Sequence, residues 1–160
     1  MRFGFDEGTV HSMYRSLARE GYTYFGRDPE SIPNLEISPI EHWMTGKANP
    51  TIMQTSFDNY MNPWVSEVER NTATGIRVNS HYLDYLYEDE MIVALLHEVA
   101  HAHAGLDAQH GPEWARAADE IGSLGQPQLQ IRLNVMWLED KGYQEYVEKF
   151  LDEVPTLGHL

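Results

Sequence analysis

The sequence predicts a single α+β domain with an N-terminal helix, a small and mainly antiparallel sheet, a central helix and further C-terminal helices. Apolar residues recur at three- and four-residue steps in residues 6–21 and 89–104, which is the period of an amphipathic helix. Apolar and polar residues alternate in residues 52–57 and 75–79, as in half-buried strands. A chain of 160 residues is long enough for one domain with its own core and too short to expect two, so residues 1–160 are expected to form one domain.

The first helix is expected over residues 6–21, with Gly21 as its stop. Prolines punctuate the segment that follows and leave room for short strands only. The expected strands are residues 35–37, 52–57, 65–69 and 75–79, with a loop over residues 43–50. Five residues separate the last two strands, which predicts a hairpin with a longer turn.

The next helix is expected to be the central and most buried one. Asp89 and Glu90 place acid in its first turn, where the helix dipole favours negative charge. A wide apolar stripe then follows, formed by Met91, Ile92, Leu95, Leu96 and Val99. Gly105 is expected to end this helix.

Another helix is expected to begin at Pro112, because proline suits the first helical position, and to close at Gly122 and Gly125. The pattern over residues 128–138 favours a helix, although its alternation also fits a strand. A final amphipathic helix is expected over residues 143–151, before a frayed tail at residues 155–160.

The central helix carries His97-Glu98-Val99-Ala100-His101, an H-E-x-x-H pattern. Positions i and i+4 lie on one helix face, about 5–6 Å apart at Cβ, so His97 and His101 can share one metal ion. Glu98 is rotated by about 100° from His97, which can place its carboxylate beside the metal. This arrangement suits metal-assisted hydrolysis, in which imidazoles hold Zn²⁺ and the carboxylate takes a proton from water.

Catalytic zinc generally has three protein ligands, so a third ligand is needed. His103 lies about 200° round the helix from His101 and cannot share the metal. Asp107 has the spacing of a metzincin ligand but lacks the required glycine at position 104. Glu120, on the following helix, is a geometrically acceptable alternative. His110 is the leading candidate, because the intervening loop lets the chain reverse and return an imidazole to the metal.

The pattern H-E-x-x-H followed by His110-Gly111-Pro112-Glu113-Trp114 resembles the SprT-like family of zinc metalloproteases, most clearly over residues 75–122. The resemblance implies a zincin-like fold, zinc bound by His97, His101 and His110, and Glu98 as general base. It also implies that Trp114 packs the second helix against the first. The chain has no cysteine with which to build the C-terminal zinc ribbon that many members carry.

The composition excludes several classes of function. The absence of cysteine removes disulfides, thiol catalysis and cysteine-based zinc sites. With 25 acidic and 11 basic residues the net charge is −14, which repels phosphate backbones. No stretch approaches the roughly 20 apolar residues of a membrane span, and the acidic N-terminus is unlike a signal peptide. We therefore expect a cytoplasmic monomer that binds neither nucleic acid nor membrane directly.

The leading hypothesis is a zinc-dependent metallopeptidase that acts on a protein or peptide substrate. Residues 75–79 are expected to offer a strand edge on which an extended substrate pairs. His81 and Tyr82 are nearby candidates for stabilising the oxyanion. The alternative is a zincin-fold interaction module that keeps a metal for stability and binds a basic partner without proteolysis. An intact Glu98 argues against the alternative, because a structural site needs no base.

Overall fold

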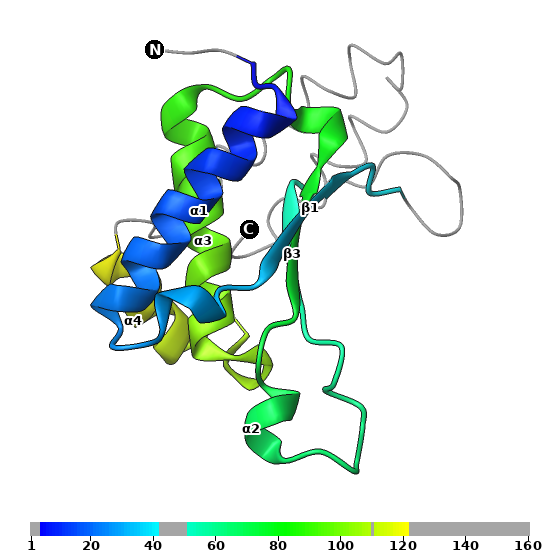
Figure 1. The fold of residues 1–160 in the computed structure, drawn as a ribbon, viewed down its shortest axis with the longest axis vertical. Helices are drawn as coiled ribbons and strands as arrows, with labels where there is room; N and C mark the ends of the chain where they lie inside the picture. Colours follow the sequence, from blue (N-terminus) through cyan, green and yellow to red (C-terminus); the bar gives the residue numbers. More distant parts are fainter. Residues whose placement is uncertain (1–3, 42–50, 110, 122–160) are drawn as a thin grey trace.

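The computed structural model describes residues 4–41, 51–109 and 111–121 (Figure 1). Its helices are α1 (Glu7–Tyr24), α2 (Glu67–Arg70), α3 (Glu88–Ala104) and α4 (Pro112–Glu120). Its strands are β1 (Asn34–Ser38), β2 (Met53–Ser56) and β3 (Gly75–Asn79), and short 3-10 turns are η1 (Pro29–Ser31), η2 (Ser80–Tyr82) and η3 (Leu106–Ala108). The predicted α+β class is confirmed. The predictions for residues 43–50 and for residues 122 onward lie outside the described residues.

Helix α1 begins where predicted but does not stop at Gly21. The Asp6 carboxylate accepts a hydrogen bond from the backbone N–H of Thr9 at 2.8 Å and caps the first turn. Gly21 is buried against α3, where an added Cβ would lie 3.1 Å from the Val99 side chain. This glycine therefore permits close packing of two helices, and α1 continues through it to Tyr24.

The sheet has the strand order β1-β3-β2, and it is mixed where a mainly antiparallel sheet was expected. Strand β1 runs parallel to β3, with Leu35 opposite Ile76. Strand β2 runs antiparallel to β3, with Thr55 opposite the same Ile76. Alternation along a sequence records which residues face the core and carries no information on strand direction. Strand β3 is central, and β2 lies at the edge of the sheet formed by the described residues.

The strand expected over residues 65–69 is wrong, because this segment contains helix α2. The Ser66 hydroxyl accepts a hydrogen bond from the backbone N–H of Glu69 at 3.1 Å and caps that helix. Serine followed three residues later by glutamate is the sequence signature of a capping box. The capping signature, and not the spacing of a hairpin, therefore determines the structure of this segment.

A buried side chain, Asn79, fixes the end of β3 to neighbouring segments. Its Oδ1 accepts from the backbone N–H of Ile40 at 3.2 Å, and its Nδ2 donates to the carbonyl of Thr51 at 2.9 Å. Asn79 is fully buried, so these bonds form away from water. The amide thus holds together the two chain segments that flank the end of β3.

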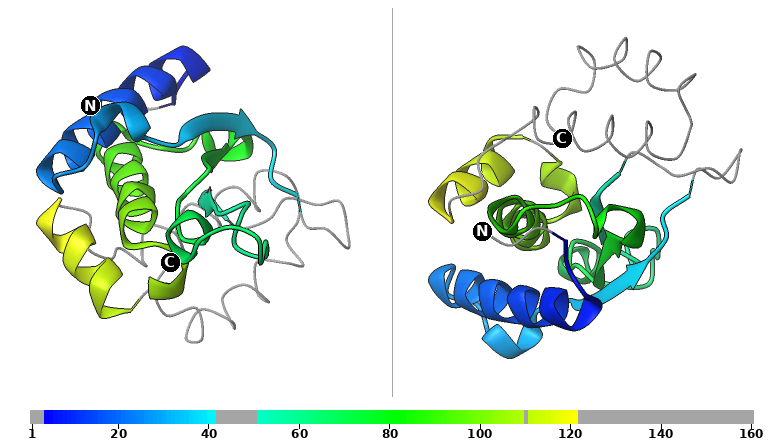
Figure 2. Two further views of the ribbon diagram at one scale, coloured as in Figure 1. Left: turned by 60° about the horizontal axis from the view of Figure 1, so that its bottom comes forward. Right: turned by 90° about the horizontal axis from the view of Figure 1, so that it is seen from above.

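Helix α3 is the central element, as predicted, and packs on two sides (Figure 2). On one side Met91, Leu95 and Val99 pack in a core shared with α1 and the sheet. On the other side Ala100 packs against α4 through a smaller cluster that contains Trp114. Gly105 ends the helix with a φ of 88°, a conformation that favours glycine.

No helix in residues 4–41, 51–109 or 111–121 has both the length and the apolar character needed to cross a membrane.

Candidate metal centre

The H-E-x-x-H segment lies in the middle of α3, where helical spacing brings its two imidazoles together. The Nε2 atoms of His97 and His101 are 3.1 Å apart. Two nitrogens that each lie about 2.1 Å from one tetrahedral zinc ion are about 3.4 Å apart. The observed pair therefore fits the shared ligation of one ion with little adjustment of either side chain.

Glu98 lies beside this pair with its side chain buried, at 5% exposure. Its carboxylate and the two imidazoles place their ligand atoms within 4.8 Å of one another. Burial raises the pKa of the Glu98 carboxyl to about 8, and a hydrogen bond with Thr55 acts in the opposite direction. The one hydroxyl proton of Thr55 is shared with the backbone carbonyl of Glu98, which lies 3.3 Å from Oγ1, and this contact ties β2 to this turn of α3.

Oε2 of Glu98 is buried and has no hydrogen-bond partner among the residues that the structure describes. Burying a carboxylate without compensation is costly, so native structures place a cation or a donor beside it. A metal ion with a water molecule would satisfy this oxygen and the adjacent imidazoles. The three residues thus form a donor set that fits a divalent metal, and they are the one such group within the described ranges.

Trp114 supports both imidazoles from α4. Its ring centroid lies 4.8 Å from that of His97 and 5.2 Å from that of His101, and it stacks on the latter at 22°. Its indole N–H donates to the backbone carbonyl of His97 at 3.4 Å. Trp114 is fully buried, which confirms that it packs the second helix against the first.

His110 lies outside the described residues, so its assignment as the third ligand remains a prediction. The chain on either side of it turns sharply. Gln109 has a positive φ of 46°, and the N–H of Gly111 donates to the carbonyl of Ala108 at 2.8 Å. A Cβ at Gly111 would lie 2.9 Å from that same carbonyl, so a side chain would not fit. This explains the glycine that precedes Pro112.

The other candidates for the third ligand have different surroundings. Both carboxylate oxygens of Asp107 accept hydrogen bonds, one from the Tyr60 hydroxyl at 3.1 Å and one from Asn71 Nδ2 at 3.0 Å. Glu120 lines a pocket with His103 and acts on the pKa of that imidazole. Neither belongs to the group of residues placed to share a metal with His97.

His103 packs away from the metal centre, as expected. Its ring stacks on Phe25 with centroids 3.8 Å apart and an interplanar angle of 6°. Burial, together with the positive charge of Arg27, lowers the pKa of His103. Arg27 also donates to the carbonyls of Ala102 and His103 at 3.3 and 3.4 Å, so it caps the end of α3. Sequence reasoning did not identify this role for Arg27.

The two oxyanion candidates lie in η2, directly after β3. Tyr82 is 1% exposed and belongs to the main core, where burial raises the pKa of its hydroxyl. A core side chain is poorly placed to contact a substrate, so Tyr82 is not an oxyanion donor. His81 is half-buried, and its backbone N–H donates to Asn79 Oδ1 at 3.2 Å.

The fold places a candidate H-E-x-x-H metal site on the central helix of an α+β domain, an arrangement typical of a metalloprotease-type fold. Comparison with protein-family models matches the SprT-like family over residues 33–148, which is more than half of the chain. The chain therefore belongs to the SprT-like family. The match extends well beyond residues 75–122, over which the resemblance was evident in the sequence. No curated protein and no solved structure matched the chain.

Proposed function

We propose that this protein is a zinc-dependent metallopeptidase. The observation that carries the proposal is the pairing of two imidazole nitrogens 3.1 Å apart with a buried carboxylate oxygen that has no partner among the described residues. A helix built for packing alone would gain nothing from this combination, because buried polar groups are costly.

His97, His101 and His110 would hold the ion. Zinc, when bound, lowers the pKa of a water ligand to about 7 and polarises a carbonyl group. Glu98 acts as the general base: its carboxylate takes a proton from the attacking water and passes it to the leaving amine. Trp114 keeps the two imidazoles in the orientation that ligation needs, because it contacts both rings.

The edge strand for an extended substrate is β2, and the expectation that β3 fills this role is wrong. Both sides of β3 are paired, with β1 and with β2. The outer side of β2 has no strand partner within the described residues, and Thr55 on this strand contacts the Glu98 turn of α3. A polypeptide paired along β2 would therefore pass close to the base.

Two substitutions test the proposal. Glu98→Gln should retain stoichiometric zinc and abolish the cleavage of an unstructured protein such as casein, whereas His110→Ala should lose the metal. His11→Ala is the matched control, because His11 is an exposed histidine on α1 and should change neither zinc content nor cleavage. Undiminished turnover by Glu98→Gln would remove Glu98 from the mechanism, and full zinc content in His110→Ala would refute the third ligand.

A further inference from the structure

The segment between β2 and β3 displays apolar side chains to solvent. Within the described part of the chain six large apolar side chains are exposed, and four of them lie on residues 57–70, hereafter the apolar loop. They are Tyr60 (37%), Met61 (85%), Trp64 (92%) and Val68 (78%). Isolated exposed apolar residues need no explanation, but several in one short segment mark an interaction surface.

The backbone of the apolar loop is held in place by local hydrogen bonds. Consecutive turns close at Tyr60 and Asn62, whose N–H groups donate to Phe57 and Asn59, both at 3.1 Å. The side chain of Asn62 then accepts from the N–H of Trp64 at 3.0 Å. Because the backbone is already ordered, little conformational entropy is lost when a partner binds these side chains.

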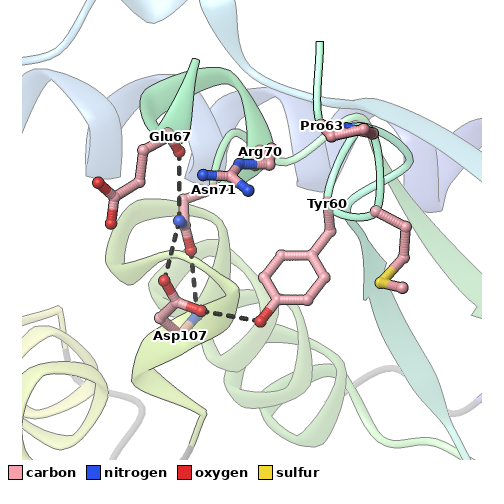
Figure 3. A pocket seen from close by; sticks show the side chains of 7 residues that line it. Tyr60, Pro63, Glu67, Arg70, Asn71 and Asp107 are labelled. Atoms are coloured by element: carbon pink, nitrogen blue, oxygen red, sulfur yellow. Dashed lines mark hydrogen bonds between the residues drawn. The ribbon is translucent and has the colours of Figure 1, made fainter. Parts of the chain in front are cut away.

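The apolar loop is also fastened to the chain that follows α3 (Figure 3). Asp107 of η3 accepts from the Tyr60 hydroxyl at 3.1 Å and exchanges two hydrogen bonds with Asn71. A pocket of about 310 Å³ lies beside this junction. Tyr60, Met61 and Pro63 form its apolar wall, while Glu67 and Arg70 line it as well. The loop thus combines exposed apolar groups with a concave site.

The position of the loop relates it to the metal centre. It begins directly after β2, the strand whose Thr55 contacts the Glu98 turn, and it projects beyond the sheet at the end marked by α2 in Figure 1. An extended chain advances about 3.3 Å per residue, so β2 guides roughly 13 Å of a bound polypeptide. Thr55 is the third of the four β2 residues, so a polypeptide paired along β2 would reach the start of the apolar loop about two residues, or roughly 7 Å, beyond the position next to Glu98.

Charge indicates the chemistry of the partner. The apolar loop carries three acidic residues, Asp58, Glu67 and Glu69, against one basic residue, Arg70. The whole chain carries −14, which opposes nucleic acid, anionic lipid and a second copy of the same chain. A polypeptide with apolar side chains next to lysine or arginine complements both the apolar groups and the acidic surroundings.

We propose that the apolar loop is a substrate-capture site. It binds an extended polypeptide segment with apolar side chains flanked by lysine or arginine, beyond the C-terminal end of β2 and outside the bond to be cleaved. The position of that bond rests on the proposed peptidase function, but the binding itself requires no cleavage.

The first test measures binding in the Glu98→Gln full-length protein, which separates capture from catalysis. Fluorescence anisotropy is recorded with a labelled 20-residue unstructured peptide that contains leucine and phenylalanine among lysines. Met61→Ser/Trp64→Ser should weaken binding about ten-fold or more, the loss typical of removing an aromatic anchor. Tyr24→Ser is the matched control, because Tyr24 is 62% exposed at the end of α1 and should leave binding unchanged.

Peptide variants test the chemistry of the partner. Replacing the apolar residues by serine, or the lysines by glutamate, should each weaken binding about ten-fold. Equal binding of all three peptides would overturn the assignment of the partner. Failure of Glu98→Gln to bind the first peptide, or equal binding by the double variant, would overturn the capture site.

The same variants reveal other occupants of the surface. Analytical sedimentation measures self-association, and phosphatidylserine-containing vesicles measure membrane binding. Self-association or vesicle binding that Met61→Ser/Trp64→Ser abolishes, with peptide binding unchanged, would assign the loop to a second copy or to a membrane and overturn the proposal.

Kinetics in the protein with Glu98 intact separate this inference from the proposed function. Met61→Ser/Trp64→Ser should raise KM about ten-fold for a long substrate with kcat unchanged, and should leave a hexapeptide substrate unaffected. Cleavage with an unchanged KM for the long substrate would overturn the capture site and leave the peptidase standing. Peptide binding that depends on Trp64, without any cleavage, would support the capture site and overturn the proposed peptidase function.

Discussion

Removing the Trp114 side chain should weaken the packing of α4 against α3 and, at the same time, lower the affinity of the metal centre for zinc. Trp114 is fully buried, and the other buried members of its cluster are three alanines, Ala100, Ala117 and Ala118. Replacing a buried tryptophan by alanine costs about 3–5 kcal/mol, and the three alanines are too small to fill the space. We therefore expect Trp114→Ala to lower the free energy of unfolding by about 4 kcal/mol.

Trp114→Phe separates packing from hydrogen bonding. It keeps an aromatic ring but loses the indole N–H that donates to the His97 carbonyl at 3.4 Å. A neutral hydrogen bond contributes about 0.5–1.5 kcal/mol, and the reduced volume adds a further cost, so we expect about 1.5 kcal/mol in total. Because the indole ring contacts both imidazoles, zinc affinity should fall about 10- to 100-fold in Trp114→Ala and less in Trp114→Phe.

The assay is urea unfolding of the chelator-treated protein, followed by chelator competition to measure zinc affinity. Trp64→Ala is the matched control, because it makes the same substitution at a residue that is 92% exposed. It should change the free energy of unfolding by about 0.5 kcal/mol at most. A loss below about 1 kcal/mol in Trp114→Ala would refute the claim that this side chain holds α4 to α3. Unchanged zinc affinity would refute its role at the imidazoles.

Three further predictions follow from buried positions. Asn79→Ala should lower the free energy of unfolding by about 3 kcal/mol in urea titrations, because it leaves buried backbone groups without partners; a loss below about 1 kcal/mol would contradict this. Gly21→Leu should cost about 1–3 kcal/mol in the same titrations, since even a Cβ would lie 3.1 Å from Val99, and wild-type stability would disprove the close packing. In chelator-treated protein, Glu98→Gln should be more stable than wild type at pH 8 and closer to it at pH 5. The reason is that burial raises the pKa of the folded-state carboxyl from 4.5 to about 8, so wild type loses stability as the pH rises through this window, at roughly 1.4 kcal/mol per unit. A difference independent of pH would refute this explanation.

The periodicity of apolar residues correctly predicted the elements that have a distinct apolar face packed on the core. The bounds of β3 match the expected residues 75–79, and α3 spans the expected central helix and ends before Gly105. In both elements the apolar residues face a core, so the sequence pattern follows the secondary-structure period. Strand direction carries no such pattern, and the parallel pairing of β1 with β3 could not be predicted.

The errors concern residues whose local signal has two physical meanings. Glycine can end a helix or permit another helix to approach, and Gly21 does the latter because Val99 lies against it. Serine can begin a helix or lie in a strand, and the glutamate three residues after Ser66 decides for the helix. The first ambiguity depends on a distant residue, whereas the second could have been resolved from the sequence.

The contacts around the candidate site also differ in whether they depend on neighbouring or on distant residues of the sequence. His97, Glu98 and His101 are separated by less than two helical turns, so their proximity follows from helix geometry alone. The fastening of Tyr60 and Asn71 to Asp107 joins residues far apart in the sequence, and no pattern announces it. The same holds for Arg27, which reaches the end of α3 from the chain that follows α1.

The H-G-P-x-W pattern was informative because its residues serve fold and site together. Gly111 is needed where the chain turns against Ala108, and Pro112 occupies the first position of α4. Trp114 is the one large side chain among the described buried members of the cluster between α3 and α4, and it also contacts both imidazoles. A substitution that disturbs the metal centre from this side must therefore also weaken the packing of α4. This coupling predicts that loss of zinc affinity and loss of stability in the metal-free protein will rank Trp114 variants in the same order.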